Sequence, residues 1–571
     1  MFLDSYTVSA LQSNLLQDCW AFLPELILAG TIILMLLVRL LGARWHLGWE
    51  ALILTLAALG VSVMQWQTGA PARDAFGGGL FGNEYAGLLR YDNFTIFIRI
   101  FLYAFTALTI WLTMLTGIPD QEDSADFYCL LLGAALGMSL MASANHLLMV
   151  FIAVEMASLP SFGLAGFLKG KRASSEAALK YVVYGGGAAG IMLYGISLIA
   201  GRFGTGYLPD LGLAIPLALK NGVDSVMLLG LLFIFIGLAF KLSAVPFHFW
   251  CPDVFEGAAA EVAAYLSVAS KGAALALTGR LLLTIVGTPT SLTTLAPYLI
   301  PTLAFFGALT ATFGNLAAYP QTNLKRLLAY STIAHAGYMM MGLATLSRDG
   351  AEAVLFYLIA YLAMNLGAFA VVAFIRNLTG SEELASYRGL IYRSPALAIT
   401  MSVFLLSLLG MPPLVGFAAK FQIFRVLYDA AQLHAANAAQ WQVVANTPGV
   451  VEGLAISASE TAAEQTRLSY VLFTLLVIGG VNTVISLVYY IKVLKVMILE
   501  RTVEEVEGQP TPQLPLKAGS AFLVTFLAAL VLVGGILWNP LSVQSKQGVK
   551  EFPQVQLIAP DPVKVTAGAG Q

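Results

Sequence analysis

The sequence predicts an all-α polytopic membrane protein with about fourteen transmembrane helices. Its 571 residues are 58% hydrophobic and only 11% charged, whereas soluble domains carry about 25% charged residues. The mean hydropathy is +0.80, and the apolar residues gather in runs of about 20, the length that crosses a bilayer as a helix. Two of these runs contain prolines with a lysine nearby. The composition therefore excludes a soluble fold, and the two interrupted runs mark places where a simple membrane helix is not expected.

The apolar runs follow one another along the chain and are separated mostly by short polar loops. The predicted membrane helices are 22–42, 48–67, 92–116, 125–143, 145–168, 177–201, 225–249, 260–286, 295–317, 323–346, 352–377, 395–430, 468–498 and 517–538. Acidic residues, and no Lys or Arg, precede the first run, which argues against a cleaved signal peptide with a basic start. We therefore expect the first span to be retained.

The positive charges predict the orientation of these helices. Lys and Arg gather in short cytoplasmic loops of membrane proteins. Here the clusters all follow odd-numbered helices: Arg39/Arg44, Lys169/Lys171/Arg172, Lys325/Arg326, Arg376/Arg388/Arg393 and Lys492/Lys495/Arg501. The odd loops are therefore assigned to the cytoplasm, and both termini to the opposite, non-cytoplasmic side.

Proline interrupts two of the spans, the seventh at Pro246 and the twelfth at Pro412 and Pro413. Interrupted helices at corresponding places in two halves indicate an inverted repeat with a binding or transport pathway between the halves. Helices seven and twelve are five apart, which predicts two inverted five-helix repeats. The polar, Ala-rich segment 430–467 is predicted to be an inserted external loop. The predicted units are 1–124 (helices 1–3), 125–290 (first repeat, helices 4–8), 291–500 (second repeat, helices 9–13) and 501–571 (helix 14 and tail).

Several ionisable side chains fall inside the predicted spans, where charge is expensive and an ionisable group is by default a functional-site hypothesis. A buried lysine can load and release a proton as its neighbours change charge, so these side chains predict a proton pathway. Its members are Glu155, Lys180, Lys241, Lys271, His335 and Lys420.

Two kinds of neighbour are expected to support this pathway. Glu155 would set the charge of either Lys180 or Lys241. Proline breaks free backbone carbonyls that line a cavity, so Pro246, with nearby His248, is predicted to help solvate Lys241. Pro412 and Pro413 are predicted to do the same at the other break.

Structural explanations of some of these residues also remain open. A lysine near the end of a span usually extends its amine to the interface, which applies to Lys180 and to Lys420. His335 could be a neutral histidine hydrogen-bonded to a helix backbone. The methionine run 339–341 is expected to serve packing rather than copper binding, because no second Met cluster is present.

The sequence gives no sign of a metal, cofactor or catalytic centre in this chain. Cys19, Cys129 and Cys251 form no CxxC motif, and the five histidines lack ligand spacing. We therefore expect no iron–sulfur, zinc, haem or nucleotide site, so any redox cofactor must belong to a partner. A net charge of −2 provides no basic surface for nucleic acid.

Five segments in order resemble the antiporter-like membrane subunits of proton-pumping NADH:quinone oxidoreductase (respiratory complex I), in particular the N type. They are SSEAALKYVVYGGGAAGIMLYG, FKLSAVPFHFWCPDVFEG, SKGAALAL, NLKRLLAYSTIAHAGY and LLGMPPLVGFAAKF, and the likeness covers about residues 90–500.

The resemblance implies fourteen helices, two inverted repeats and discontinuous helices seven and twelve. It makes Glu155 the fifth-helix glutamate paired with Lys241 of the broken seventh helix. It makes Lys180 the sixth-helix lysine, Lys271 the central lysine of the eighth helix and Lys420 the terminal lysine of the twelfth. His335 would belong to the central polar axis, which links the two halves.

The resemblance also implies partners and a location. Quinone, FMN and iron–sulfur clusters would reside in other subunits, and the neighbours would be the M-type and small K/J/A-type subunits in a bacterial inner membrane. The electron donor stays open among NADH, a reduced deazaflavin and ferredoxin. The alternative is a subunit of a multisubunit Mrp-type Na⁺/H⁺ antiporter, whose relatives share the fold. Their usual WLP motif and the histidine before ATMV are absent here, which favours the N type.

Overall fold

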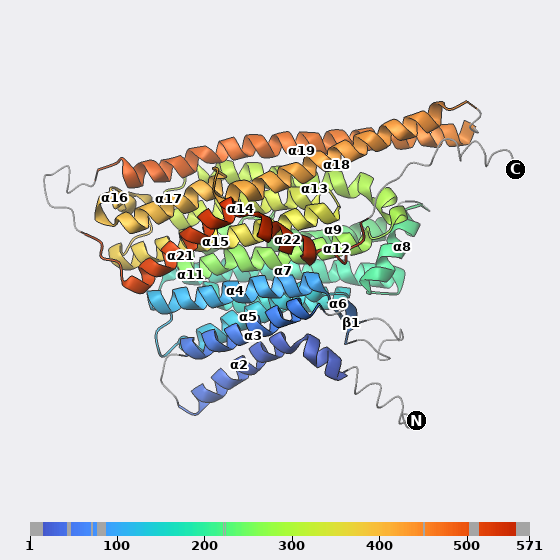
Figure 1. Ribbon diagram of the computed structural model, residues 1–571. Coiled ribbons are helices and arrows are strands. Elements are labelled where there is room, and N and C mark those ends of the chain that lie inside the picture. Colours follow the sequence, from blue (N-terminus) through green and yellow to red (C-terminus); the bar gives the residue numbers. More distant parts are fainter. Residues whose placement is uncertain are drawn as a thin grey trace, which may run out of the picture.

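The computed structural model describes residues 15–42, 47–69, 72–76, 87–220, 222, 224–448, 452–501 and 513–554. Most of them are helical, and the helices run roughly along one common direction (Figure 1). Helices α2 and α3 form one edge of the bundle, and α18 and α19 form the opposite edge. Arg44 and both chain ends lie outside the described residues, so the side of the termini remains a prediction.

The first half of the chain forms helices close to the predicted spans, together with a helix over Leu208–Lys220 that was not predicted. They are α2 (Leu23–Leu40), α3 (Gly48–Thr68), α4 (Asn93–Thr116), α5 (Ser124–Ser143), α6 (Leu147–Ala165), α7 (Arg172–Phe203), α8 (Leu208–Lys220), α9 (Ser225–Leu242), α10 (Trp250–Gly257), α11 (Ala260–Tyr265), the π-helical turn η1 (Leu266–Ser270) and α12 (Lys271–Ile285).

The second half forms a further set of helices. They are α13 (Pro289–Ala318), α14 (Leu324–Leu343), α15 (Arg348–Thr379), the 3₁₀ turn η2 (Leu384–Tyr387), α16 (Leu390–Arg393), α17 (Pro395–Leu409), α18 (Val415–Asn446), α19 (Glu452–Ile498), α21 (Ala518–Ile536) and α22 (Asn539–Gly548).

Twelve helices in the described part of the chain are long and apolar enough to cross a membrane. Helix α14 and the interrupted pair α17 and α18 are not among them, because α14 is less apolar and α17 is short. If α14 and the interrupted pair also cross, the number becomes the predicted fourteen. The inverted repeat likewise remains a prediction.

Local sequence signals explain where several helices begin. Asp92 begins α4 by accepting a hydrogen bond from Thr95 N (2.8 Å), and Asp224, Thr288, Asn323 and Ser347 cap their helices in the same way. Such caps satisfy amide groups that have no partner within the helix. The helix starts therefore follow from short polar signals between the apolar runs.

Both predicted breaks are present. Helix α9 ends at Leu242, Ser243 takes a left-handed conformation (φ +57°), and α10 begins at Trp250. Helix α17 ends at Leu409, Gly410 takes φ +94°, and α18 begins at Val415. Lys241 therefore precedes the first break, and Lys420 follows the second.

Residues 430–446 and 452–467 differ from the expectation of an inserted loop. They extend α18 and α19 into a helical hairpin that projects past the neighbouring helices (Figure 1). Its helices bury Ala431, Ala438, Ala458 and Ala462, and between them His434 Nδ1 lies 2.6 Å from Gln465 Oε1. Alanine has the highest helix propensity and lets helices approach closely, which explains why this polar segment is helical.

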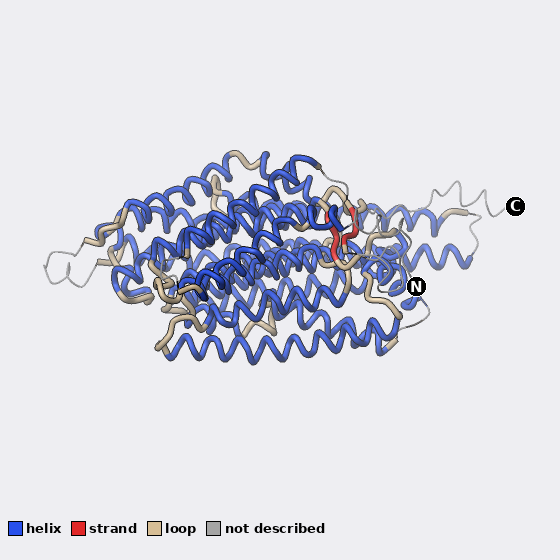
Figure 2. The backbone as a smooth tube through the Cα atoms, turned by 90° about the horizontal axis from the view of Figure 1, so that it is seen from below, coloured by secondary structure: helices blue, strands red, loops and turns tan. Residues whose placement is uncertain are grey.

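The fold also contains a short two-stranded sheet that the all-α prediction omitted. Strand β1 (Arg73–Ala75) pairs antiparallel with β2 (Leu89–Tyr91), and Figure 2 places this sheet at one end of the bundle. Tyr207 donates a hydrogen bond to the Asp74 carboxylate and so ties the sheet to the loop before α8.

The buried core is continuous through the bundle. Helix α15 is the most deeply buried of the candidate membrane helices, since 89% of its most apolar 18-residue stretch is buried. Helix α22 packs against α4 and α15. Just after it, the Glu551 carboxylate accepts a hydrogen bond from Asn93 N (2.8 Å), and the Phe552 ring lies 5.3 Å from that of Phe94. The last described segment therefore covers the start of α4.

Candidate functional site

Lys241 lies at the first break, buried to 1% exposure near the end of α9. Its amine has no hydrogen-bond partner within the described part of the chain. The expected solvation by freed carbonyls is therefore wrong in detail, because the Phe240 carbonyl accepts instead from Trp250 Nε1 (3.0 Å). The charge of Glu155, on α6, acts on Lys241 without direct contact within 4.0 Å. The two groups are therefore not in contact, and their pairing remains a prediction.

Lys271 begins α12, directly after the π-helical turn, and is also buried to 1% exposure. Its amine donates to Ser243 Oγ (3.0 Å), in the first break, and lies 3.7 Å from Cys251 Sγ. The rings of Trp250 and Phe255 lie 5.1 and 5.4 Å away, within the range of a cation–π contact. The first break thus surrounds this lysine with polarisable groups and supplies no carboxylate in contact with it.

Polar side chains follow on the neighbouring central helices. Asn365 Nδ2, on α15, donates to Ser267 Oγ (2.5 Å) in the π-helical turn. One helical turn earlier on α15, Tyr361 OH donates to Thr332 Oγ1 (2.9 Å) on α14. π-Helical turns occur frequently at functional sites. These two hydrogen bonds lie between the surroundings of Lys271 and those of His335.

His335, on α14, is held by tyrosine side chains rather than by helix backbone. Nδ1 lies 2.6 Å from Tyr357 OH, and Nε2 lies 3.2 Å from Tyr490 OH. Tyr490 OH in turn lies 2.6 Å from Ser331 Oγ. The backbone-bonded alternative is therefore wrong for this histidine, whose two ring nitrogens connect α15 with α19.

Lys420 completes the buried series on α18. Its amine donates to the Leu409 carbonyl (2.9 Å), which the second break leaves free, and lies 4.8 Å from the Tyr338 ring. Gly410 has a positive φ, and a Cβ there would meet the Lys420 side chain at 3.0 Å. The charge of Lys420 acts on His335. The side chain is 4% exposed, so it does not extend to the surface.

Lys180 lies apart from the buried series. It is on the first turns of α7, where its amine contacts Asp253 (2.7 Å) and Glu176 (2.8 Å). Arg326 bridges Asp253 (2.7 Å) and Glu256 (2.6 Å) around a hollow of about 200 Å³. Burial alone would raise the pKa of Asp253, but hydrogen bonds from Lys180 and Arg326 hold this pKa below its usual value. The position of Lys180 therefore agrees with the alternative explanation, in which a lysine near the end of a span extends its amine to the interface.

The auxiliary residues lie at the breaks. His248 is buried and packs its ring 4.5 Å from Phe313. Pro246 lies between α9 and α10, and Pro412 and Pro413 lie between α17 and α18. In the first break, Val245 N donates to Thr310 Oγ1 (3.0 Å) of α13, which satisfies one amide that the interruption leaves without a helical partner.

The tyrosines around His335 and several buried ion pairs were not predicted from the sequence. Tyr357 and Tyr361 are four residues apart on α15, a spacing that places both on one helix face and could have indicated them. The missed pairs join segments far apart in the sequence and have no local signal. They are Glu25–Arg99 (2.6 Å), Asp92–Arg280 (2.8 Å), Glu261–Arg376 (3.1 Å) and Lys325–Glu382 (2.8 Å).

In the ranges that the structure describes, no three His, Cys, Asp or Glu side chains gather where they could hold a metal ion. Cys19, Cys129 and Cys251 are free thiols. The buried polar side chains at the two breaks and on the central helices are amines, an imidazole and tyrosine hydroxyls.

Comparison with known proteins agrees with this architecture. The family model described as "NADH:quinone oxidoreductase/Mrp antiporter, TM" matches residues 144–444. The chain is 37% identical over 470 residues to NADH-quinone oxidoreductase subunit N of Anaeromyxobacter sp., covering 80% of this chain and 83% of the relative. It is 38% identical over 536 residues to subunit N 2 of Sorangium cellulosum, covering 91% and 95%.

Solved structures give the same result at the level of the fold. A chain of respiratory complex I from Thermus thermophilus has a TM-score of 0.67 and 29% identity, covering 91% of this chain and 98% of that chain. A chain of the Mrp complex from Dietzia sp. has a TM-score of 0.73 at 17% identity, covering 97% and 99%, a likeness that concerns the fold alone. The chain therefore belongs to the NADH:quinone oxidoreductase/Mrp antiporter transmembrane family, among the antiporter-like N subunits of complex I.

Proposed function

We propose that this chain is a proton-translocating membrane subunit of an NADH:quinone oxidoreductase, driven by quinone reduction in other subunits. The observation that carries the proposal is the buried series Lys241, Lys271, His335 and Lys420. Among the described residues, the Lys241 amine has no hydrogen-bond partner, the Lys271 amine donates to a serine and the Lys420 amine to a backbone carbonyl, and His335 contacts two tyrosine hydroxyls. An ionisable group that is buried in a membrane bundle without a carboxylate in contact is expensive, and it is by default a functional-site hypothesis.

The proposed cycle begins at the first break. The Glu155/Lys241 pair changes the charge of Lys271, since the charges of both Glu155 and Lys271 act on Lys241. His335 and Lys420 then carry the proton onward, supported by the interaction of their charges. Lys180 takes part at the entry side, where the hollow beside Asp253 provides access from the surface.

We further propose that the chain has no redox centre of its own. Quinone, FMN and iron–sulfur clusters would be held by partner subunits, with M-type and small K/J/A-type subunits as membrane neighbours. The complex would lie in a bacterial inner membrane with both termini of this chain on the non-cytoplasmic side. The relatives named NADH-quinone oxidoreductase subunit N support this assignment over an Mrp-type antiporter, whose likeness is at 17% identity.

The test uses the complete complex in sealed vesicles. Lys241→Ala and Glu155→Ala should leave the subunit assembled and strongly reduce the proton gradient formed per quinone reduced. Lys495→Ala, an exposed lysine on α19, is the matched control and should leave pumping unchanged. Normal pumping by both Lys241→Ala and Glu155→Ala would contradict the assigned roles. Sodium-dependent proton exchange by the chain without redox partners would favour the antiporter instead.

A further inference from the structure

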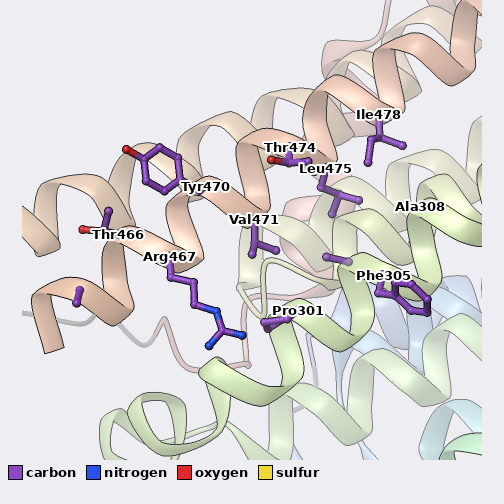
Figure 3. Close-up of a pocket in the computed structure, with 12 residues that line it drawn as sticks. Pro301, Phe305, Ala308, Thr466, Arg467, Tyr470, Val471, Thr474, Leu475 and Ile478 are labelled. Atoms are coloured by element: carbon purple, nitrogen blue, oxygen red, sulfur yellow. The ribbon is translucent and has the colours of Figure 1, made fainter. Parts of the chain in front are cut away.

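A groove of about 620 Å³ follows the seam between α13 and α19, within the size range of about 300 to 1,000 Å³ that ligand pockets occupy. Figure 3 shows the Arg467 side chain extending from α19 towards Pro301 of α13, at one end of the groove. Val471, Leu475 and Ile478 follow on α19, with Phe305 and Ala308 on α13. The groove is therefore apolar along its length and carries a cation at one end.

The position of Arg467 along α19 coincides with a change in composition. Residues 452–467 contain Glu452, Glu460, Glu464 and Arg467, whereas residues 468–491 contain no Asp, Glu, Lys or Arg. The second stretch is long enough to cross a hydrocarbon core of about 30 Å at 1.5 Å per residue. Arg467 therefore lies where the helix would enter the membrane. Beside it, Tyr470 is 68% exposed, as is typical of the aromatic belt at membrane interfaces.

Arg467 is available to an anion. Within 4.0 Å it forms no ion pair with any carboxylate in the described ranges. Glu464, three residues earlier on α19, forms no ion pair with it. Thr466 and Thr474 are both exposed and line the same groove. At the Arg467 end, the groove thus combines a guanidinium with the hydroxyl of Thr466, whereas Thr474 lies about two helical turns farther along α19.

We propose that this groove binds one anionic phospholipid. Its phosphate would contact Arg467, and an acyl chain would lie along Val471, Leu475 and Ile478. Ile478 is eleven residues beyond Arg467, which corresponds to about 16 Å, or half the hydrocarbon thickness of one bilayer. That distance matches the reach of one lipid leaflet.

The experiment labels the complete complex in vesicles with a phosphatidylglycerol that carries a photoactivatable group in its acyl chain. Mass spectrometry of the digested chain should find the label within 301–308 and 471–478, the two walls of the groove. A phosphatidylcholine probe with the same acyl chain should label these segments less. The preference should be about fivefold, corresponding to roughly 1 kcal/mol for one basic residue at an anionic headgroup.

Two variants separate the headgroup contact from the chain contact. Arg467→Gln should abolish the preference for the anionic probe and keep the labelling by phosphatidylcholine. Thr474→Trp, at an exposed position along the groove, should reduce labelling by both probes. Lys495→Gln, at the other end of α19, is the matched control and should change neither.

Three results would overturn the proposal. One is equal labelling by both probes in the unaltered complex, and another is an undiminished preference in Arg467→Gln. The third comes from a photoreactive residue introduced at position 474 of the chain. If it crosslinks to another subunit instead of to lipid, the groove is a protein interface.

Discussion

The buried pair of Asp92 and Arg280 gives a sharp test of how this bundle is held together. Arg280 Nη1 and Nη2 each donate to the Asp92 carboxylate at 2.8 Å, and Nη2 also donates to Thr95 Oγ1 (2.9 Å). Both members of the pair are almost completely buried. The perturbation is Asp92→Asn, which keeps the shape of the side chain and removes its charge.

The expected cost follows from this geometry. Removing one partner leaves an uncompensated buried charge, which costs about 3 to 5 kcal/mol, or a factor of roughly a hundred or more in the folding equilibrium. The exposed pair of Arg388 and Glu500, at 3.1 Å, provides the control. Exposed pairs contribute about 0 to 1 kcal/mol, so Glu500→Gln should have little effect.

The assay is the free energy of unfolding from denaturing-detergent titration in mixed micelles, followed over a pH series. Burial alone would raise the pKa of Asp92, but Arg280 holds this pKa below its usual value. The pair therefore contributes fully above the unfolded pKa of about 3.9, and its contribution is lost as the pH falls through the lower folded pKa. Asp92→Asn should remove that part of the acid sensitivity.

A double variant decides whether the two charges act as a pair. Asp92→Asn together with Arg280→Met should cost less than the sum of the two single variants, because neither charge is then left unpaired. The reasoning is refuted if the single variants add without coupling, or if Asp92→Asn costs no more than the exposed control.

Three further variants test the packing and the polar contacts. Gly416→Ala puts a methyl carbon 1.8 Å from a backbone oxygen of α17 and should destabilise the fold by about 1 to 3 kcal/mol, whereas Gly187→Ala, with open space around it, should not. Tyr357→Phe removes the 2.6 Å hydrogen bond to His335; it should cost about 0.5 to 1.5 kcal/mol in denaturant titrations and slow pumping. Burial lowers the pKa of His434. The contribution of His434 to the stability of the α18–α19 hairpin should therefore be complete above a pH of about 6.5 and fall at lower pH. Limited proteolysis should detect this loss, and His434→Ala should abolish the pH dependence.

The helices and both breaks could be predicted from the sequence because their signals are local. Apolar runs of the right length and prolines inside two of them are visible without knowledge of distant contacts. Segment 430–467 was mispredicted for the opposite reason. Its polarity suggested a loop, while its alanine content and the contact between His434 and Gln465 made a helical hairpin.

The candidate site was predictable in its charged members and not in their partners. Lys241, Lys271 and Lys420 are conspicuous because a charge in an apolar run is rare. Their surroundings depend on helix packing, and so Ser243 rather than a carboxylate meets Lys271. In the same way, Lys180 meets Asp253, 73 residues away along the chain. No spacing rule predicts such a contact.

The segment after α22 has a consequence for how the protein is made. Phe552 packs against Phe94, and its ring lies 5.8 Å from the Arg280 guanidinium. The ribosome makes Phe552 only 272 residues after Arg280, in a chain of 571 residues. The ion pair between α4 and α12 therefore waits through nearly half of the synthesis of the chain without its final cover. Insertion of the early helices and completion of their core are thus separate events in the biogenesis of this chain.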